Sequence, residues 1–514
     1  MKYKIIPFKK ISMFSAATLT ATALQAQVPK NPNIVVFLVD DMGWQDTSLP
    51  FWSEKTSLNE NYETPNMERL AKHGVKFTQA YACAVSTPTR VSLMTGMNQA
   101  RHRVTSWTAY ANASTDGSDT HLSWPAWNVN GLQPDSISQG VYATTLPQIL
   151  KNNGYATIHV GKAHFGANGT LGANPLNIGF TENVGGTAAG HPGSYYGTSN
   201  YSNGSSLHAV PDLTHYWGTN TYLTEALTLE AIKRMDTARV NAKPFYLYMA
   251  HYAIHAPIQR DERFYQKYID KELPAGQAAY ASMIEGMDKS LGDIMDYLET
   301  NNLTDSTIIL FMSDNGGYSG AFSLSCSDAS HCHNLPLKSG KGSIYEGGIR
   351  EPMIVRWPGV TQDNTTCNNY VHIVDYFPTI LEMAGISNYN LVQTIDGVSF
   401  APLLKGEANA NPTRDLIWHF PNKWGGWDYG SETYSAIRSG DYKLIYRWHT
   451  STFELYNITE DIGESNNILL ENVDVAKPLI TRLSDYLRSV DAQRPAYKDS
   501  GSAVLWPDEV DIEI

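Results

Sequence analysis

The chain has 514 residues, of which 42% are hydrophobic, so it is long enough to bury a large core and to form more than one domain. Its formal net charge of −13 at pH 7 opposes binding of nucleic acid to the surface as a whole. An anionic small-molecule substrate therefore requires a site that a metal ion or clustered Lys, Arg and His side chains make locally positive.

The N-terminal segment 1–26 is typical of a secretory signal peptide. Four lysines precede a weakly apolar run that ends in small residues near Ala26. Ser and Thr interrupt this run before the roughly 20 apolar residues that a membrane span needs, and the sequence offers no other candidate span. We therefore expect a periplasmic or secreted protein with no membrane span after signal cleavage.

Four short apolar runs, each followed by polar or glycine-rich residues, predict the strands of a mostly parallel sheet. They lie at 33–41, 156–164, 245–255 and 306–317, and helical patterns separate them. Apolar residues at spacings of three and four predict one long helix over 280–298. The fold class is therefore α/β, a large mostly parallel sheet flanked by helices, with functional side chains expected beyond the carboxyl ends of the strands.

After residue 407 the pattern changes to that of a smaller α+β subdomain. Segment 434–448 predicts two strands around a Ser-Gly-Asp turn, and the segment TFELYNI at 452–458 and a helix near 477–490 follow. We expect a signal peptide at 1–26, a catalytic domain at 27–407 and a C-terminal subdomain with an antiparallel sheet at 408–514.

Two long segments, 104–140 and 165–220, are rich in Gly, Ser, Asn, Tyr and Trp, and loops of such length are usually functional or disordered. Their aromatic rings could stack on a sugar, or they could simply fix the loops to the domain. These rings belong to Trp107, Tyr110, Trp124, Trp127, Tyr195, Tyr196, Tyr201 and Trp217.

Four cysteines are too few for a disulfide scaffold. Cys326 and Cys332 lie in one predicted loop and could pair. Free and partly buried thiols are the alternative for them, as for Cys83 and Cys367.

Acidic residues close the first and the last predicted strand. Asp40 and Asp41 follow the first strand, and Asp314 with Asn315 follows the fourth. Carboxylate and amide oxygens suit a hard divalent cation, Ca²⁺ or Mg²⁺, rather than zinc. Asp is also common in ordinary turns, but two pairs at equivalent strand ends favour a metal site, because neighbouring acids need a cation between them.

Basic residues follow the other predicted strands or lie in a glycine-rich loop. Each alone could be a solvated or packed side chain, whereas together they provide the positive site that the acidic surface requires. They are Lys162, His164, His251, His255, Lys338 and Lys341.

Six segments, in this order, resemble the motifs of the formylglycine-dependent (type I) sulfatases of the alkaline phosphatase superfamily. They are VVFLVDDMGW, STPTRVSLMTG, VGKAHFG, YAIHAP, MSDNGG and PLKSGKGSIYEGGIREPMIVRWPG. The match spans most of the mature chain apart from the two long loops and the tail. In particular, the chain resembles bacterial Ser-type carbohydrate sulfatases and arylsulfatases, because Ser86 stands where the family usually has Cys.

The resemblance implies a role for each matched residue. The ligands of one Ca²⁺ ion would be Asp40, Asp41, Asp314, Asn315 and the formylglycine (3-oxoalanine) made from Ser86. Arg90 would hold this group in place, and Lys162 and His164 would lie beside it. The substrate would contact Lys162, His255 and Lys341, of which the last two face the leaving oxygen. His251 and Lys338 match no family role.

The resemblance also implies the chemistry. The aldehyde hydrates to a geminal diol, one hydroxyl attacks sulfur, and protonated His255 supplies the proton of the leaving alcohol. The second hydroxyl, deprotonated by His164, allows sulfate to leave, whereas an ordinary serine would be sulfated once and then stall.

Two origins of Ser86 stay open. The protein could be a natural Ser-type enzyme that an anaerobic radical maturation enzyme oxidises, or a Cys-type enzyme with an engineered serine. Cys83 does not replace it, because the motif would then require Pro at position 85, where Val85 stands.

The expected function is exo-acting removal of O-sulfate from a sulfated glycan of galactose or N-acetylgalactosamine type. A phosphomonoester or phosphonate hydrolase that uses Ser86 directly is one alternative, which the Lys and His set disfavours because phosphatase relatives rely more on two metal ions. A non-catalytic binder of sulfated glycans is the other alternative, and it would not need the general acid His255.

Overall fold

The computed structural model describes residues 1, 30–319, 333–424 and 432–512. Nearly all of the expected signal peptide, together with Cys326 and Cys332, therefore lies outside the described residues. Cys83 and Cys367 are free thiols. None of the helices in the described ranges combines the length and the apolar composition that crossing a membrane requires.

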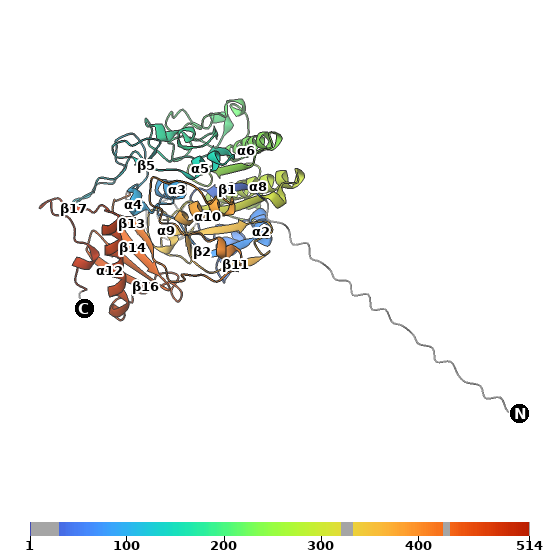
Figure 1. Cartoon of the computed structure of the whole chain (residues 1–514). Helices are drawn as coiled ribbons and strands as arrows, with labels where there is room; N and C mark the ends of the chain where they lie inside the picture. Colours follow the sequence, from blue (N-terminus) through green and yellow to red (C-terminus); the bar gives the residue numbers. More distant parts are fainter. Residues whose placement is uncertain (2–29, 320–332, 425–431, 513–514) are drawn as a thin grey trace.

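A nine-stranded sheet forms the centre of the described residues, which confirms the predicted α/β class (Figure 1). Its order is β11, β2, β10, β9, β1, β8, β6, β7, with β12 beside β2. The four predicted strands are β1 (Asn33–Val39), β6 (Ala156–Gly161), β8 (Phe245–Ala250) and β9 (Thr307–Ser313). These four run parallel to one another, and β10 (Arg350–Arg356) is antiparallel to both of its neighbours. The other members are β2 (Val75–Tyr81), β7 (Glu182–Val184), β11 (Thr365–Cys367) and β12 (Val371–His372).

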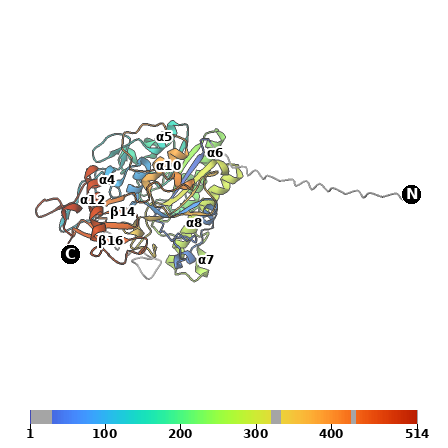
Figure 2. The ribbon, with the colours of Figure 1, turned by 60° about the horizontal axis from the view of Figure 1, so that its bottom comes forward.

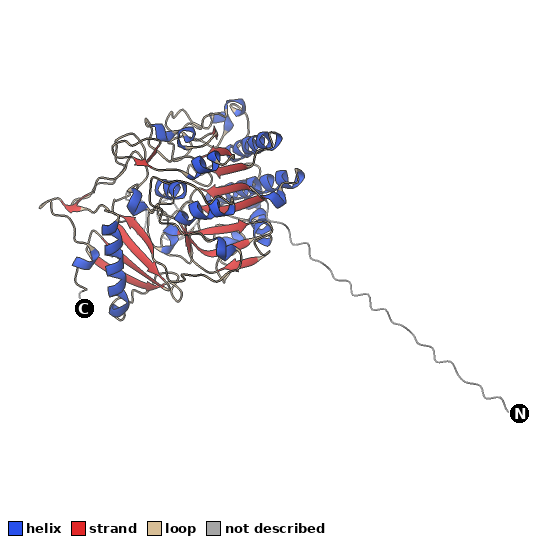
Figure 3. Ribbon diagram, in the orientation of Figure 1, coloured by secondary structure: helices blue, strands red, loops and turns tan. Residues whose placement is uncertain are grey.

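Helices cover both faces of this sheet, which explains why its strands are almost continuously apolar (Figure 3). Along β1, Val36 and Leu38 face one core cluster, whereas Val35 and Phe37 face another. The first cluster includes α3 (Ser86–Thr95), α5 (Leu146–Asn152) and α10 (Tyr376–Met383). The second includes α2 (Pro65–Lys72), α6 (Leu223–Val240) and the predicted long helix, α8 (Ala275–Thr300).

The C-terminal part of the chain forms a four-stranded antiparallel sheet with one helix, as predicted (Figures 1 and 2). Its strands are β13 (Leu416–Phe420), β14 (Tyr434–Ser439), β15 (Tyr442–Arg447) and β16 (Thr452–Asn457), and its helix is α12 (Val473–Ser489). One face packs on α12, and the other packs on catalytic-domain residues that include Tyr81 and Val85. Both faces are therefore buried. The exact division at 407/408 stays a prediction.

The two long segments contain short elements only. These are β3 (Leu122–Ser123), β4 (Leu132–Gln133), four 3-10 helices (Leu171–Ala173, Pro175–Ile178, Gly197–Ser199, Thr214–Tyr216) and β7 of the large sheet. In Figure 1 much of this irregular chain lies at the top of the molecule, around α5 and α6.

The remaining elements are short. The helices are α1 (Ser57–Asn61), α4 (Gln99–His102), α7 (Tyr265–Asp270), α9 (Glu346–Ile349) and α11 (Ala401–Leu404). The strands are β5 (Val141–Tyr142) and β17 (Ala496–Tyr497), and further 3-10 turns lie at Thr304–Ser306, Ile373–Asp375 and Pro507–Glu509.

Buried histidines should make the fold sensitive to acid. Burial lowers the pKa of His102, His159, His251 and His419 to about 3. Between pH 6.5 and 3 the unfolded chain therefore binds protons that the folded chain does not, and the free energy of unfolding falls as the pH falls. Thermal unfolding followed between pH 7 and pH 4 measures this loss.

A His251→Gln variant provides the control, because it removes one of these protons. Its unfolding free energy should depend less steeply on pH than that of the parent, by up to about 1.4 kcal/mol per pH unit. Equal slopes in the two proteins would contradict the assignment of His251 as a buried neutral histidine.

Candidate active site

Three carboxylates lie together where β1 and β9 end. Asp40 and Asp41 follow β1 and Asp314 follows β9, all are fully buried, and one oxygen of each lies within 4.8 Å of the others. Asn315 donates from Nδ2 to Asp41 Oδ1 at 2.8 Å, so its own Oδ1 is directed to Ser86 Oγ at 3.3 Å. The parallel pairing of the two strands thus brings together the metal-site residues expected from the sequence.

Ser86 is the first residue of α3 and is 3% exposed. Its Oγ lies 3.3 Å from Asp40 Oδ1 and 3.0 Å from Lys162 Nζ. The amino end of a helix carries a partial positive charge, so this position favours an anionic ligand or a developing negative charge.

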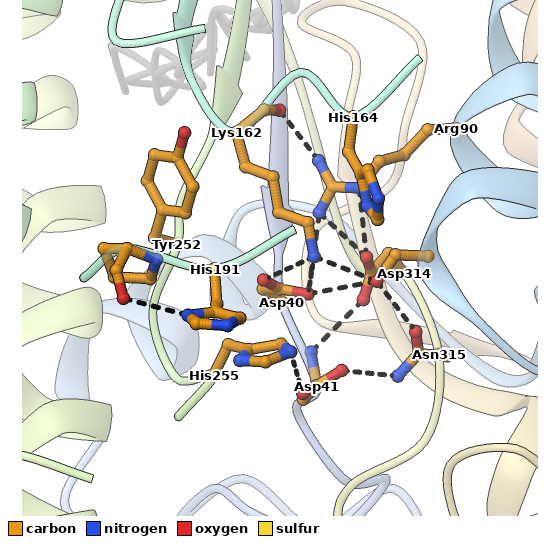
Figure 4. A network of polar contacts seen from close by, with 12 residues as sticks. Asp40, Asp41, Arg90, Lys162, His164, His191, Tyr252, His255, Asp314 and Asn315 are labelled. Atoms are coloured by element: carbon orange, nitrogen blue, oxygen red, sulfur yellow. Dashed lines mark hydrogen bonds and ion pairs between the residues drawn. The ribbon is translucent and has the colours of Figure 1, made fainter. Parts of the chain in front are cut away.

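Arg90, one helical turn after Ser86, fixes α3 against two strand ends (Figure 4). Its Nε and Nη2 donate to Asp314 Oδ2 at 3.1 and 2.8 Å, and its Nη1 donates to the Lys162 carbonyl at 2.9 Å. Because the guanidinium is fully buried and paired with a carboxylate in two hydrogen bonds, it holds the start of the helix rigidly.

Two lysines balance the other carboxylates. Lys162 Nζ lies 2.7 Å from both oxygens of Asp40, and Lys341 Nζ lies 2.7 Å from Asp41 Oδ1. Burial nevertheless raises the pKa of Asp40 well above its ordinary value, whereas Lys341 and His255 outweigh burial and hold the pKa of Asp41 below it. Asp40 therefore needs further positive charge to stay ionised, and a divalent cation at these oxygens would supply it.

Each of two histidines has one ring nitrogen fixed by a backbone carbonyl. His164 Nε2 lies 2.8 Å from the Thr108 carbonyl, and its buried Nδ1 has no hydrogen-bond partner among the described residues. His255 Nδ1 lies 2.9 Å from the Ala256 carbonyl, and its Nε2 faces Asp41 Oδ2 at 3.5 Å. Since a carbonyl only accepts, the fixed nitrogen carries the hydrogen, and the other nitrogen is available for chemistry.

The electrostatic surroundings favour the neutral form of both rings. Burial, assisted by Lys162, lowers the pKa of His164 well below its ordinary value, and burial with Lys341 does the same for His255. The backbone is also held in unusual conformations here, because Asp41 and His164 have positive φ angles of 64° and 50°. Such conformations cost energy and are frequent at functional sites.

A cavity of about 420 Å³ opens above these groups. Five of the residues expected to act on substrate line it, namely Ser86, Lys162, His164, His255 and Lys341. Asp40, Asp41, Arg90, Asp314 and Asn315 are fully buried and are not among its lining residues. The cavity therefore has a cationic wall over a carboxylate cluster.

Of the loop aromatics considered from the sequence, Trp107 and Tyr110 line the cavity. The other six are not among its lining residues, and several of them form hydrogen bonds that fix the loops. Tyr195, for example, is buried and its hydroxyl donates to the carbonyls of Tyr252 and His255 at 2.6 and 2.8 Å. For such rings, the alternative that they fix the loops to the domain is therefore correct.

Three histidine or aromatic residues of the lining escaped the sequence analysis: His191, His208 and Trp424. Neither histidine directly follows an apolar run, which was the signal used for most of the other candidates, and Trp424 lies four residues after the apolar run that forms β13. The histidines come from the second long loop, and an unusual grouping of His with aromatic residues there was the only available hint.

His251 and Lys338 lie outside the cavity lining. His251 is fully buried, with Nε2 2.8 Å from Ser290 Oγ. Lys338 Nζ lies over the ring of Tyr345, 4.1 Å from its centre, and donates to the Glu464 carbonyl. Their contacts are those of structural side chains.

Comparison with known proteins agrees with this geometry. The family model described as "Sulfatase" matches residues 32–386, and that of the N-sulphoglucosamine sulphohydrolase C-terminal region matches residues 340–493. A sulfatase of Formosa agariphila is 29% identical over 97% of both chains. The N-acetylgalactosamine-6-sulfatase of Mus musculus is 28% identical over 87% of this chain and 78% of its own.

Among solved structures, Ps i-CgsB in complex with k-i-k-neocarrahexaose has a TM-score of 0.71 and 27% identity, and the match covers 90% of this chain and 94% of that one. The large sheet with helices on both faces and the separate antiparallel sheet are those of the alkaline phosphatase-like fold. The chain therefore belongs to the sulfatase family and is a sulfuric ester hydrolase.

Proposed function

We propose that this sulfatase removes a sulfate ester from the end of a sulfated glycan, with a formylglycine made from Ser86 and one Ca²⁺ ion. The observation that carries the proposal is a single cavity that combines Ser86, cationic side chains and aromatic rings above a carboxylate cluster. Ammonium groups suit the sulfate, and aromatic faces suit the apolar side of a sugar.

The cavity volume supports exo action, and the names of two relatives support a sugar of galactose or N-acetylgalactosamine type. The cavity of about 420 Å³ is near the small end of the ~300–1,000 Å³ range of small-ligand sites, which favours a terminal sugar over a long chain segment. The names of two relatives refer to an N-acetylgalactosamine-6-sulfatase and to a complex with a neocarrahexaose.

The residues fit a calcium ion and a formylglycine. Asp40, Asp41, Asp314, Asn315 and residue 86 would provide an all-oxygen ligand set, and the raised pKa of Asp40 fits a site that needs a cation. A bound Ca²⁺ would add positive charge at the sulfate oxygens and at the oxygen of residue 86. A formylglycine, as its hydrate, would supply two hydroxyl groups at that position.

The chain's own side chains then have separate tasks. Lys162 and Lys341, which line the cavity, would neutralise charge on the sulfate oxygens. His255 Nε2 would carry the proton to the leaving oxygen, because its Nδ1 is fixed by Ala256, and the sulfate anion would favour protonation of this ring. His164 Nδ1 would accept a proton from residue 86, because its Nε2 donates to Thr108.

We also propose that the mature protein is periplasmic or secreted and that an anaerobic radical enzyme oxidises Ser86. The pattern of segment 1–26 and the serine in the motif support these points.

The decisive experiment is the mass of the tryptic peptide that contains residue 86, from protein made in its native host. The peptide should be lighter than its sequence by two hydrogen atoms, and an unmodified peptide would contradict formylglycine formation. Rates on an aryl sulfate and on the matching aryl phosphate test the choice of ester.

Removal of calcium should cost both activity and stability. Dialysis against a chelator is expected to abolish sulfate release, and added Ca²⁺ should restore it and raise the thermal midpoint. At a Ca²⁺ concentration 100 times Kd the gain in the free energy of unfolding is about 2.7 kcal/mol. An Asp314→Asn variant should respond much less to Ca²⁺. A thermal midpoint that responds to Zn²⁺ but not to Ca²⁺ would contradict the proposed ion.

A further inference from the structure

Two stacked histidines form part of the cavity wall beside the proposed general acid. The rings of His191 and His208 have centres 3.9 Å apart and are inclined by only 15°. His191 also lies nearly parallel to His255, at 5.5 Å and 13°, and Figure 4 shows these two rings side by side. All three residues line the cavity.

Backbone contacts fix the position of His191. Its Nδ1 lies 3.0 Å from the carbonyl of the next residue, Pro192, which is buried. The Gly193 amide donates to the His208 carbonyl at 2.8 Å and so joins the two loop segments that carry the stacked rings. The His191 ring is therefore held by its own loop and by the stack.

This arrangement determines what the free nitrogen of His191 can do. A carbonyl cannot donate, so Nδ1 carries the hydrogen and Nε2 presents only a lone pair while the ring is neutral. Burial lowers the pKa of His191 to about 4, and the charges of Lys162 and Lys341 act in the same direction. His191 Nε2 is thus a hydrogen-bond acceptor at neutral pH.

An acceptor at this place complements one kind of group. A sugar hydroxyl can donate to it, whereas the oxygens of a sulfate can only accept and would meet the lone pair unpaired. The lysines of the cavity have the opposite preference, because an ammonium group only donates. The lysines therefore suit the oxygens of the sulfate ester that is cleaved, and His191 suits a free hydroxyl group next to that ester.

Resting on the proposed glycan sulfatase function, we propose that His191 is a specificity-determining residue that accepts a hydrogen bond from a free hydroxyl of the sugar next to the sulfate ester. The substrate class is then a terminal sugar that carries one sulfate. A sugar with a second sulfate on the neighbouring oxygen is rejected, since it places an acceptor against an acceptor and leaves both unpaired.

The test compares monosulfated and disulfated sugars. Methyl β-galactosides with one sulfate at each ring position first identify the preferred ester, and the same ester with a second sulfate on a neighbouring oxygen is the competitor. For the parent protein, kcat/KM should favour the monosulfate by at least about 10-fold, the effect of one lost hydrogen bond with an unpaired acceptor. In His191→Ala this ratio should fall to about one.

Two variants serve as controls. His208→Phe keeps a ring against His191 but removes the ring nitrogens of residue 208, so the ratio of kcat/KM for the mono- and disulfated sugars should stay close to the parent's even if both rates change. His73→Ala removes a half-exposed histidine that follows α2 and pairs with Asp363, and it should change neither the activity nor the ratio. The thermal midpoint of every variant shows whether it is folded, and His191→Gln, which keeps an acceptor, replaces the alanine variant if that protein is unstable. The glutamine variant should then retain part of the preference.

Binding separates this proposal from the proposed function. Calorimetry with unoxidised protein gives Kd for the mono- and disulfated galactosides without any turnover. The monosulfated galactoside is again expected to bind more tightly. If no sulfate ester is hydrolysed, the proposed function fails, while the ratio of the two Kd values still decides the role of His191. Equal affinity or preference for the disulfated sugar, or an unchanged ratio in His191→Ala, overturns the proposal.

Discussion

Replacing Ser86 with alanine is expected to abolish turnover and leave the fold intact. Under the proposed mechanism the side chain would lose the carbon-bound oxygen from which the nucleophile is made, and enzymes that lose their nucleophile fall in kcat by a factor on the order of 10⁴–10⁶. The fold should survive, because the Ser86 hydroxyl contacts two oxygens at 3.3 Å and Lys162 Nζ at 3.0 Å only, and Arg90 fixes α3 independently. Rates on the preferred sulfate ester, together with thermal midpoints, measure both effects.

A Ser86→Cys variant is the matched control. In a host that oxidises cysteine at this motif it should be active, because cysteine and serine give the same aldehyde. It should be inactive in a host that modifies serine only. An alanine variant with turnover close to that of the parent would contradict a catalytic role for residue 86.

Of the substitutions proposed for this protein, Lys443→Met should cause the largest loss in the free energy of unfolding. Lys443 Nζ lies 3.0 Å from Glu346 Oε1 and 2.9 Å from Glu464 Oε1, and none of the three side chains is exposed. Removing the ammonium leaves two carboxylates buried without it, which costs about 3–5 kcal/mol. Even with Lys443 present, burial raises the pKa of Glu464 to about 7. Urea unfolding measures the change in free energy.

Lys289→Met is the control for this variant. Lys289 forms an exposed pair with Asp293 one helical turn away, and such a pair contributes only about 0.3–0.5 kcal/mol. If the two methionine variants lost similar stability, the buried network would not be the reason for the loss at Lys443.

The sequence predicted the parallel strands and the carboxylate cluster well, for one physical reason. Strands buried on both faces are continuously apolar, so the polar residues after Val39 and after Ser313 stand out in the sequence. The sequence of β10 gave no comparable signal for its antiparallel orientation, because pairing with β2 and β9 depends on partners far away in the chain.

Two other features could not be read from local patterns. Lys443 looks like a polar residue on a solvated face, yet both faces of its sheet are covered, one by α12 and one by the catalytic domain. His191 and His208 lie in irregular loops, where conformation depends on contacts such as that between Gly193 and His208 rather than on periodicity.

The cavity draws its residues from two kinds of structure. Ser86 comes from α3 and Lys162 from the end of β6, and His255 and Lys341 come from the segments after β8 and before α9, whereas His191, His208, Trp107 and Tyr110 come from the two long loops. Some mutations in the loops can therefore alter which sulfate ester is accepted while the groups from α3 and β6 stay in place. Over evolutionary time, such a protein can acquire new substrates by loop replacement alone, with its chemistry inherited unchanged.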